Sequence, residues 1–308
     1  MSDSLSTPRV GIFMPAYNYG SFIDEALESL KAQDFQDFFV HIVDDGSDDG
    51  ITADKLSSIN YEKGKVFLNS DNQGVAKRQR DHFELFKDYD FILVLCADDK
   101  LRKDFLSKSV NYLDDHPECG AVGCSIQRFG DDENLFTLNA DKCKLPDMLV
   151  ENSFNGSALM RTKALRSISL LTKRVRYQDW ERWLGMLANG WVLGIIDEPL
   201  FFYRQHSRSL SRTATNAMEL SIKEGLYDRF RDLYERYSKE VYLLSQKLLL
   251  ESRLEGREVW EAKVWLDSQY TALIKEKENS QKVWKAKLLL EEENEMLIKE
   301  NERLKKLE

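Results

Sequence analysis

The sequence lacks the patterns of secreted, membrane-spanning and zinc-finger proteins. No apolar run approaches the roughly 20 residues that a membrane helix needs. The N-terminal stretch has no basic segment followed by an apolar core, so we expect no signal peptide. Neither a CxxC pair nor metal-ligand spacing occurs among the cysteines, which are Cys96, Cys119, Cys124 and Cys143. We therefore expect a cytoplasmic protein with reduced thiols.

Net positive charge is also missing. The chain of 308 residues carries a formal net charge of −9, whereas proteins that bind nucleic acid depend on basic surface. A nucleic-acid partner is therefore not expected, although a small phosphate needs only one local positive site. Hydrophobic residues make up 42% and charged residues 31% of the chain, which is typical of a soluble globular protein with one highly charged region.

Short apolar runs alternate with helical patterns up to about residue 206. Strand-like runs rich in Val, Ile and Phe cover residues 9–15, 37–45, 65–70 and 90–99. Between the first two runs, apolar residues recur at helical spacing after Ser21 and Asp24, which resemble a helix start. This alternation predicts an α/β fold with a largely parallel sheet that helices cover on both faces.

Polar residues follow each of these runs, at 15–18, 44–47, 69–72 and 98–99. Asp is common in turns, so the pair at 98–99 taken alone is a simple strand stop. Two adjacent carboxylates nevertheless repel each other unless a cation lies between them, and hard divalent cations take oxygen ligands. Ligands of parallel sheets bind at the carboxyl ends of the strands. Four polar strand ends together therefore favour a ligand site.

The character of the chain changes after residue 213. Proline is absent, and Glu, Lys, Leu and Arg dominate. A heptad of aliphatic residues with polar residues between them comprises Val283, Leu290, Leu297 and Leu304 with Lys287, Asn294 and Asn301. Polar residues at one heptad position specify register and favour two parallel strands. We predict one domain over residues 1–213 and a helical coiled-coil region over 214–308 that forms an oligomer, with a dimer favoured.

Several ordered motifs between residues 8 and 212 resemble the family 2 glycosyltransferases, which adopt the GT-A fold. These motifs are "MPAYNYGSFIDEALESLKAQDF", "HIVDDGSDDG", "NSDNQGVAKRQR", "FILVLCADDKL", "FNGSALMRTKAL", "YQDWERWL" and "EPLFFYRQHSRSLS". The resemblance implies a Rossmann-like α/β catalytic domain, followed here by the helical tail. It also implies inverting transfer of a hexosyl or deoxyhexosyl group from a nucleotide diphosphate sugar to a hydroxyl acceptor. By family association, the acceptor is a growing bacterial surface polysaccharide or a lipid-linked glycan.

The resemblance assigns the nucleotide to the first two motifs. Pro15, Ala16 and Tyr17 match the residues that line the base and ribose site, and Asp45 matches the acceptor of hydrogen bonds from the base. A carboxylate suits that task because uracil and thymine both offer an imide N–H. A UDP-sugar or a dTDP-sugar is therefore the expected donor.

The third motif departs from the family pattern. Many relatives carry an Arg seven residues after the Asn, where this chain has Gln79. Lys77, Arg78 and Arg80 are candidates to replace that contact, unless it is absent. We place Arg78 at the nucleotide site.

The acidic motif implies a divalent metal, Mn²⁺ or Mg²⁺. By resemblance, Asp99 binds the metal and Asp98 binds the ribose or the sugar, while His206 lies where relatives often carry a His near the diphosphate and metal. Cys96 replaces the leading Asp of the usual pattern and is a poor ligand for Mg²⁺. The metal would neutralise charge on the departing diphosphate.

The remaining motifs imply a base and an acceptor site. Asp179 matches the family's catalytic base, which takes the proton of the attacking hydroxyl, although Gln178 replaces the frequent preceding Glu. We place Trp183 in the core. The predicted sugar and acceptor residues are Asn155, Gly156, Ser157 and Trp180.

Two readings compete with an enzyme of this kind. The first is a non-catalytic assembly protein, in which a degenerate transferase domain is displayed on a coiled coil. The second, a nucleotidyltransferase or a dehydrogenase, is disfavoured because no glycine-rich phosphate loop and no GxGxxG follow the first strand. The tail predicts a dimer, and no membrane-spanning helix is expected. We therefore expect the protein to reach a lipid-linked acceptor by associating peripherally with the inner face of the cytoplasmic membrane.

Overall fold

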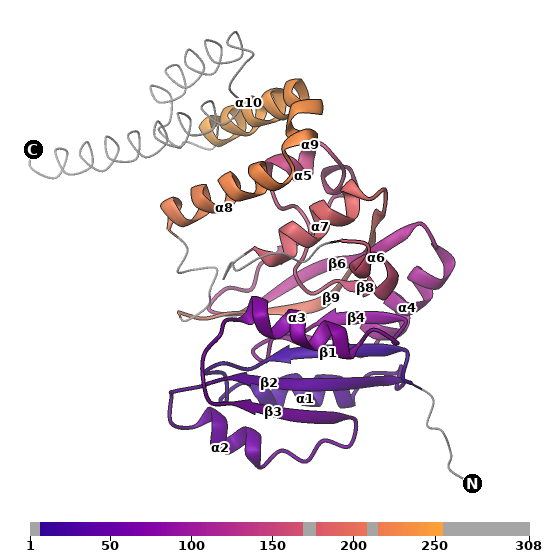
Figure 1. Ribbon diagram of the computed structural model, residues 1–308, viewed down its shortest axis with the longest axis vertical. Coiled ribbons are helices and arrows are strands. Elements are labelled where there is room, and N and C mark those ends of the chain that lie inside the picture. The colour runs from indigo at the N-terminus through magenta and orange to yellow at the C-terminus, as the bar shows by residue number, and fades with distance from the viewer. Residues whose placement is uncertain (1–6, 169–176, 208–214, 255–308) are drawn as a thin grey trace, which may run out of the picture. The chain divides into compact units, whose positions relative to one another are not determined.

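The computed structural model describes residues 7–168, 177–207 and 215–254 (Figure 1). The chain divides into two compact units, one ending at Ser209 and the next beginning at Leu210. The predicted boundary between residues 213 and 214 lies outside the described residues. Each unit is described by itself.

The first unit is built on one mixed sheet with the strand order β3-β2-β1-β4-β8-β6-β9-β5, in which β7 pairs with β6. The bounds are β1 (Val10–Pro15), β2 (Phe38–Asp45), β3 (Gly64–Asn69), β4 (Phe91–Val94), β5 (Lys100–Leu101), β6 (Cys119–Gly130), β7 (Leu135–Phe136), β8 (Leu159–Arg161) and β9 (Val192–Gln205). The first four strands pair in parallel, and β8 runs antiparallel to β4 and β6. The predicted α/β fold and its four strand-like runs are confirmed.

Helices flank this sheet in Figure 1. They are α1 (Ile23–Lys31), α2 (Thr52–Ser57), α3 (Val75–Leu85), α4 (Phe105–Asp115), η1 (Ala140–Cys143), α5 (Asp147–Val150), α6 (Thr162–Arg166) and α7 (Gln178–Ala188). The predicted apolar stripe of α1, including Ile23 and Leu30, is buried. The helix start predicted at Ser21 is wrong, because Phe22 occupies the N-cap position and no side chain caps the helix.

The register of the parallel strands brings their carboxyl ends to one edge of the sheet. Pro15 lies opposite Val43, and Asp45 lies opposite Asn69. Beyond β4 the chain stays beside β1, because the amide of Ala97 donates to the carbonyl of Pro15 at 3.1 Å. The residues that follow Ala97 are therefore delivered to the same edge as the ends of the other three strands.

The described part of the second unit consists of three helices, α8 (Asn216–Arg229), α9 (Arg231–Arg236) and α10 (Ser238–Leu254). The predicted helical character holds for these residues, but the helix is interrupted at Phe230 and Tyr237, where the backbone leaves the helical region. The heptad that begins at Val283 lies outside the described residues, so the coiled coil remains a prediction. Within the part of the chain that the structure describes, no helix is long and apolar enough to cross a membrane.

Candidate active site

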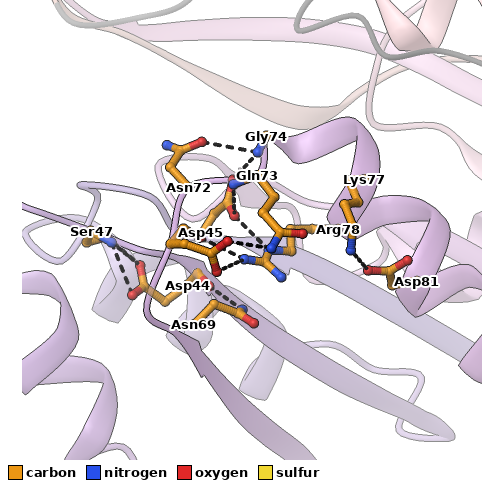
Figure 2. Close-up of polar contacts among 11 residues, drawn as sticks. Asp44, Asp45, Ser47, Asn69, Asn72, Gln73, Gly74, Lys77, Arg78 and Asp81 are labelled. Atoms are coloured by element: carbon orange, nitrogen blue, oxygen red, sulfur yellow. Dashed lines mark hydrogen bonds and ion pairs between the residues drawn. The ribbon is translucent and has the colours of Figure 1, made fainter.

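Asp45, the last residue of β2, is held by the start of α3 (Figure 2). Asp45 Oδ1 accepts hydrogen bonds from the backbone N–H of Gln73 at 3.0 Å and from Arg78 Nε at 2.6 Å. Asp45 Oδ2 accepts one from the backbone N–H of Gly74 at 2.7 Å. An acidic group suits the N-terminus of a helix, whose amides point outward unpaired. The structure thus brings together two predicted nucleotide residues, Asp45 and Arg78, as a buried ion pair.

The loops after β2 and β3 touch at Gly46. Its φ of +74° lies in the left-handed region, and a Cβ at this position would lie 2.7 Å from the backbone carbon of Asp71. The Asn69 side chain also donates to the carbonyl of Asp44 at 2.6 Å, and the Ser47 hydroxyl donates to the Asp44 carboxylate. The loops after β2 and β3 therefore approach each other so closely at Gly46 that only glycine fits there.

The residues after β1 border the same loops. Pro15 and Tyr17 are half-buried, whereas Ala16 is 1% exposed and its amide donates to the carbonyl of Val43. The Tyr17 hydroxyl donates to Asp48 at 3.3 Å. The predicted base and ribose residues therefore lie next to the loop that follows Asp45.

Two buried carboxylates, Asp98 and Asp99, follow β4. Their oxygens and the Cys96 sulfur all lie within 4.8 Å of one another. Asp99 accepts a hydrogen bond from the amide of Arg204, near the end of β9, at 2.9 Å. Asp98 Oδ2 lies 3.1 Å from His206 Nε2. The predicted metal and ribose residues are thus assembled at one place, with His206 bound to Asp98.

The chemistry of this group fits a divalent cation. Burial raises the pKa of Asp99 well above its usual range, and the neighbouring Asp98 raises it further. Burial also raises the pKa of Asp98, whereas the contact with His206 lowers it. A cation between the two carboxylates would relieve this repulsion. The Cys96 thiol, whose pKa burial raises, is a soft ligand that suits a hard cation less well than the two carboxylates do.

Asp179 lies in the first turn of α7 and is half-buried. The side-chain amide of Asn152 donates a hydrogen bond to Asp179 Oδ2 at 2.9 Å. A Cβ on Gly156 would lie 3.5 Å from the same oxygen. Asn155 is 3% exposed, and its polar side-chain atoms have no hydrogen-bond partner among the described residues. Gly156 therefore leaves room beside Asp179, and the neighbouring residue Asn155 keeps unused hydrogen-bonding capacity.

Asp179 and the acidic pair share one neighbourhood. After burial, the groups that raise the pKa of the Cys96 thiol are Asp98, Asp99 and Asp179, whereas Arg182 lowers it. Three carboxylates and one guanidinium are therefore near enough to Cys96 to influence its thiol, although they come from two segments far apart in the sequence.

Sequence reasoning missed Arg182. This side chain lies on α7 and is 3% exposed, and its Nη1 donates to the side-chain oxygen of Gln79 at 2.8 Å. Gln79 was noted only as a departure from the family pattern. The available signal was a charged residue inside a largely apolar helix segment, in which the structure buries every residue from Trp180 to Met186.

The structure corrects the prediction for Trp180. Its indole is 4% exposed, and the ring N–H donates to the carbonyl of Met148 at 2.7 Å. A side chain buried in this way has no free face on which a sugar could stack, so we assign Trp180 to the core. Trp183 is 0% exposed, which confirms its predicted place in the core. Ser157, predicted for the acceptor site, is 5% exposed.

Arg204 holds the acidic pair in place. Besides the amide bond to Asp99, its Nε donates to the carbonyl of Asp98 at 2.8 Å, and its guanidinium lies 2.8 Å from Glu25. These contacts make Arg204 a support for the two aspartates. Arg208 of this motif and Arg212, which follows it, lie outside the described residues.

A mixed α/β sheet with paired carboxylates at its carboxyl edge and a further Asp on a facing helix defines the GT-A class of glycosyltransferases. The family described as Glycosyl transferase family 2 matches residues 11–169, and the chain belongs to it.

Relatives and solved structures agree with this assignment. The chain is 26% identical to an uncharacterised glycosyltransferase of Haemophilus influenzae over 79% of this chain and 80% of that protein. It is 25% identical to the putative teichuronic acid biosynthesis glycosyltransferase TuaG of Bacillus subtilis over 66% of this chain and 82% of that protein.

Two solved structures share the fold. Staphylococcus aureus TarS in complex with UDP-GlcNAc has a TM-score of 0.57 at 18% identity, covering 75% of this chain and 73% of that chain. The mannosyltransferase PcManGT of Pyrobaculum calidifontis, in complex with GDP-Man and Mn²⁺, has a TM-score of 0.57 at 14% identity, covering 93% and 86%.

Proposed function

We propose that this glycosyltransferase moves a sugar from a UDP-sugar or a dTDP-sugar to a hydroxyl acceptor with inversion at the anomeric carbon. The observation that carries the proposal is the cluster of Asp98, Asp99 and Cys96 within 4.8 Å after β4, with Asp179 near enough to influence the same thiol. Such a group combines a place for a cation with a carboxylate able to act as a base. The UDP-GlcNAc complex of TarS and the GDP-Man complex of PcManGT support a nucleotide sugar as the donor class.

In this proposal the nucleotide binds between the ends of β1 and β2. Pro15, Ala16 and Tyr17 line the base and ribose, and Asp45 accepts a hydrogen bond from the base. Because Arg78 and the amides before α3 already bind Asp45, its carboxylate is fixed before the donor arrives. A fixed acceptor lowers the entropic cost of binding.

A divalent cation, Mn²⁺ or Mg²⁺, would be held by Asp99, with His206 beside it and Asp98 turned to the ribose or the sugar. The Mn²⁺ in the PcManGT complex supports manganese. When bound, such an ion neutralises charge that develops on the departing diphosphate. Two buried carboxylates with raised pKa values are the feature of this chain that favours the ion.

Asp179 is the proposed general base. Its carboxylate takes the proton of the acceptor hydroxyl while that oxygen forms the new bond to the anomeric carbon, and the bond to the diphosphate breaks on the opposite face. Asn152 donates to Oδ2 and so fixes the orientation of the carboxylate. The acceptor hydroxyl would enter beside Gly156, where the missing side chain leaves room, and the unpaired amide of Asn155 would bind a sugar hydroxyl.

The acceptor is proposed to be a bacterial surface polymer or a lipid-linked glycan. Two similar proteins carry such names: TuaG of teichuronic acid biosynthesis and TarS, a poly(ribitol-phosphate) beta-N-acetylglucosaminyltransferase. We further propose that residues 1–213 form the catalytic domain and that residues 214–308 form a coiled coil. A dimer would then work in the cytoplasm, at the inner face of the membrane. A monomer in analytical ultracentrifugation at micromolar concentration would contradict the dimer.

Calorimetric titration of UDP, dTDP and GDP, each with Mn²⁺ and with a chelator, tests the donor site. We expect UDP or dTDP to bind in a metal-dependent way and this binding to be lost in Asp99→Ala. Failure of all three nucleotides to bind the folded protein would contradict the proposal. The non-catalytic assembly protein would then be the better explanation, and Asp179→Asn would change nothing.

A further inference from the structure

Arg182 is a buried cation with no carboxylate in direct contact among the described residues, although its guanidinium lies 5.4 Å from the centroid of the Trp183 ring. In the described part of the chain its guanidinium makes one hydrogen bond, from Nη1 to Gln79 Oε1 at 2.8 Å, and its buried Nε has no hydrogen-bond partner. The other buried arginine of the described residues, Arg78, has the Asp45 carboxylate at 2.6 Å. Arg78 is therefore neutralised locally, whereas Arg182 is held by a neutral amide.

Such a charge is unfavourable for folding. Moving an ion out of water costs several kcal/mol unless a partner of opposite charge compensates. Burial lowers the pKa of Arg182, while the carboxylates of Asp179 and Glu181 raise it through space. A guanidinium remains protonated at neutral pH in spite of burial. An incompletely paired buried charge lowers the stability of the fold. Such a loss of stability is typical of functional sites.

The position of Arg182 links it to Asp179. The two residues lie three apart on α7, so they occupy neighbouring positions on the same side of the helix. Arg182 is thus a buried positive charge one helical turn from the proposed base.

We propose that Arg182 is a positioning residue that acts through Asp179. Its guanidinium, fixed by Gln79, places a positive charge one helical turn from Asp179 and orients that carboxylate toward the acceptor hydroxyl. The inference rests on the proposed transfer reaction and adds a residue to it. Asn152 binds the carboxylate at Oδ2, and Arg182 supplies the opposing charge from within the same helix.

Gln79 gives this arrangement a specific form. Its side-chain oxygen accepts a hydrogen bond from an N–H of Arg182, which lies 103 residues away in the sequence. The guanidinium therefore comes from α7 and the amide from α3. If the place of the charge matters more than the helix that carries it, exchanging the two residues should preserve part of the function.

The test compares turnover in variants of the full chain. The donor is whichever UDP-, dTDP- or GDP-sugar the unaltered protein hydrolyses or transfers with Mn²⁺ present. We expect Arg182→Met to lower kcat by roughly 10- to 100-fold, with the KM for the donor changed less than about twofold. Arg182→Lys should recover part of the loss, and the exchange Gln79→Arg with Arg182→Gln should be faster than Arg182→Gln alone.

A double-mutant cycle shows whether Arg182 acts through Asp179. If it does, adding Arg182→Met to Asp179→Asn should slow the enzyme no further, because the residue it serves is already gone. Multiplication of the two effects would overturn the inference. So would a tenfold weaker binding of UDP with Mn²⁺ in Arg182→Met, because Arg182 would then bind the donor itself.

Controls separate catalysis from folding. Arg161→Met removes a guanidinium that binds the carbonyls of Leu113 and Cys119, away from the acidic group, and should leave kcat within about twofold of the unaltered protein. The melting temperature of Arg182→Met should change little, because the removal of an incompletely paired charge offsets the hydrogen bond that Gln79 loses. A large fall would show a structural role and overturn the inference. Absence of turnover with every donor, in the unaltered protein, would contradict the transfer reaction and this inference with it.

Discussion

The Arg78 Nε lies 2.6 Å from the Asp45 Oδ1, and each of the two side chains is 9% exposed. Arg78 also donates to the carbonyl of Asp71 at 2.7 Å. The ion pair therefore joins β2, α3 and the loop between β3 and α3. The proposed contact with the base and the integrity of this loop depend on the same carboxylate.

Replacing Asp45 by Asn should lower both stability and nucleotide binding. The substitution leaves the Arg78 guanidinium buried without its counter-charge, which should cost about 3 kcal/mol in the free energy of unfolding. Denaturant titration measures that loss, and calorimetry with UDP measures binding. Asp71→Asn is the matched control, because the Asp71 side chain is 58% exposed and lies 3.4 Å from Arg78. Little change in stability is expected there, and equal effects of the two substitutions would refute the argument.

Gly46→Ala should disrupt the nucleotide half of the site. Its positive φ and the approach of Asp71 to 2.7 Å impose both backbone strain and a clash with main-chain atoms. Together these should cost about 3 kcal/mol of stability. Gly50→Ala is the control, because Gly50 has a φ of +73° but nothing within 4 Å of its added Cβ. It should cost only about 1–2 kcal/mol and leave UDP binding intact. Denaturant titration and calorimetry of both variants would distinguish clash from strain.

The residues that the sequence predicted well are those that follow strands. Periodicity locates the strands, and a parallel sheet brings their ends to one edge, so Asp45, Asp98 and Asp99 could be placed without coordinates. Trp180 and Arg182 could not be distinguished in the same way. A helical stripe shows which side of a helix is buried, but the partner of a buried polar group depends on tertiary packing. Gln79 and Arg182 are 103 residues apart, and no local pattern joins them.

The acidic pair predicts a stability that depends on Mn²⁺. In the absence of metal, Asp98 and Asp99 repel each other inside the protein, as their raised pKa values indicate. Adding Mn²⁺ at about 100 times its dissociation constant should stabilise the fold by about 2.7 kcal/mol. Differential scanning calorimetry with Mn²⁺ and with chelator measures this gain. Asp99→Asn should abolish it, whereas Cys96→Ser should keep it, because the thiol is not expected to bind the ion. Loss in both variants would show that the sulfur is a ligand.

Two histidines predict the response of the fold to acid. His41 on β2 and His82 on α3 are buried, and their Nδ1 atoms lie 3.0 Å apart, so one ring must donate to the other. The pKa of each imidazole is lowered from 6.5 to about 4, chiefly by burial and, for His41, also by the positive charge that a protonated His82 would carry. Below pH 6.5 the unfolded chain therefore binds protons that the folded chain refuses.

Stability should consequently be full above pH 6.5 and fall as the pH decreases toward about 4. The slope should reach roughly 1.4 kcal/mol per pH unit for each imidazole within that window. Urea titrations at several pH values across the window measure it. His82→Phe should flatten the slope, since it removes one titrating ring and relieves the other. His116→Gln, which removes an imidazole outside the pair, should leave the slope unchanged. An unaltered slope in His82→Phe would mean that other groups govern the acid response.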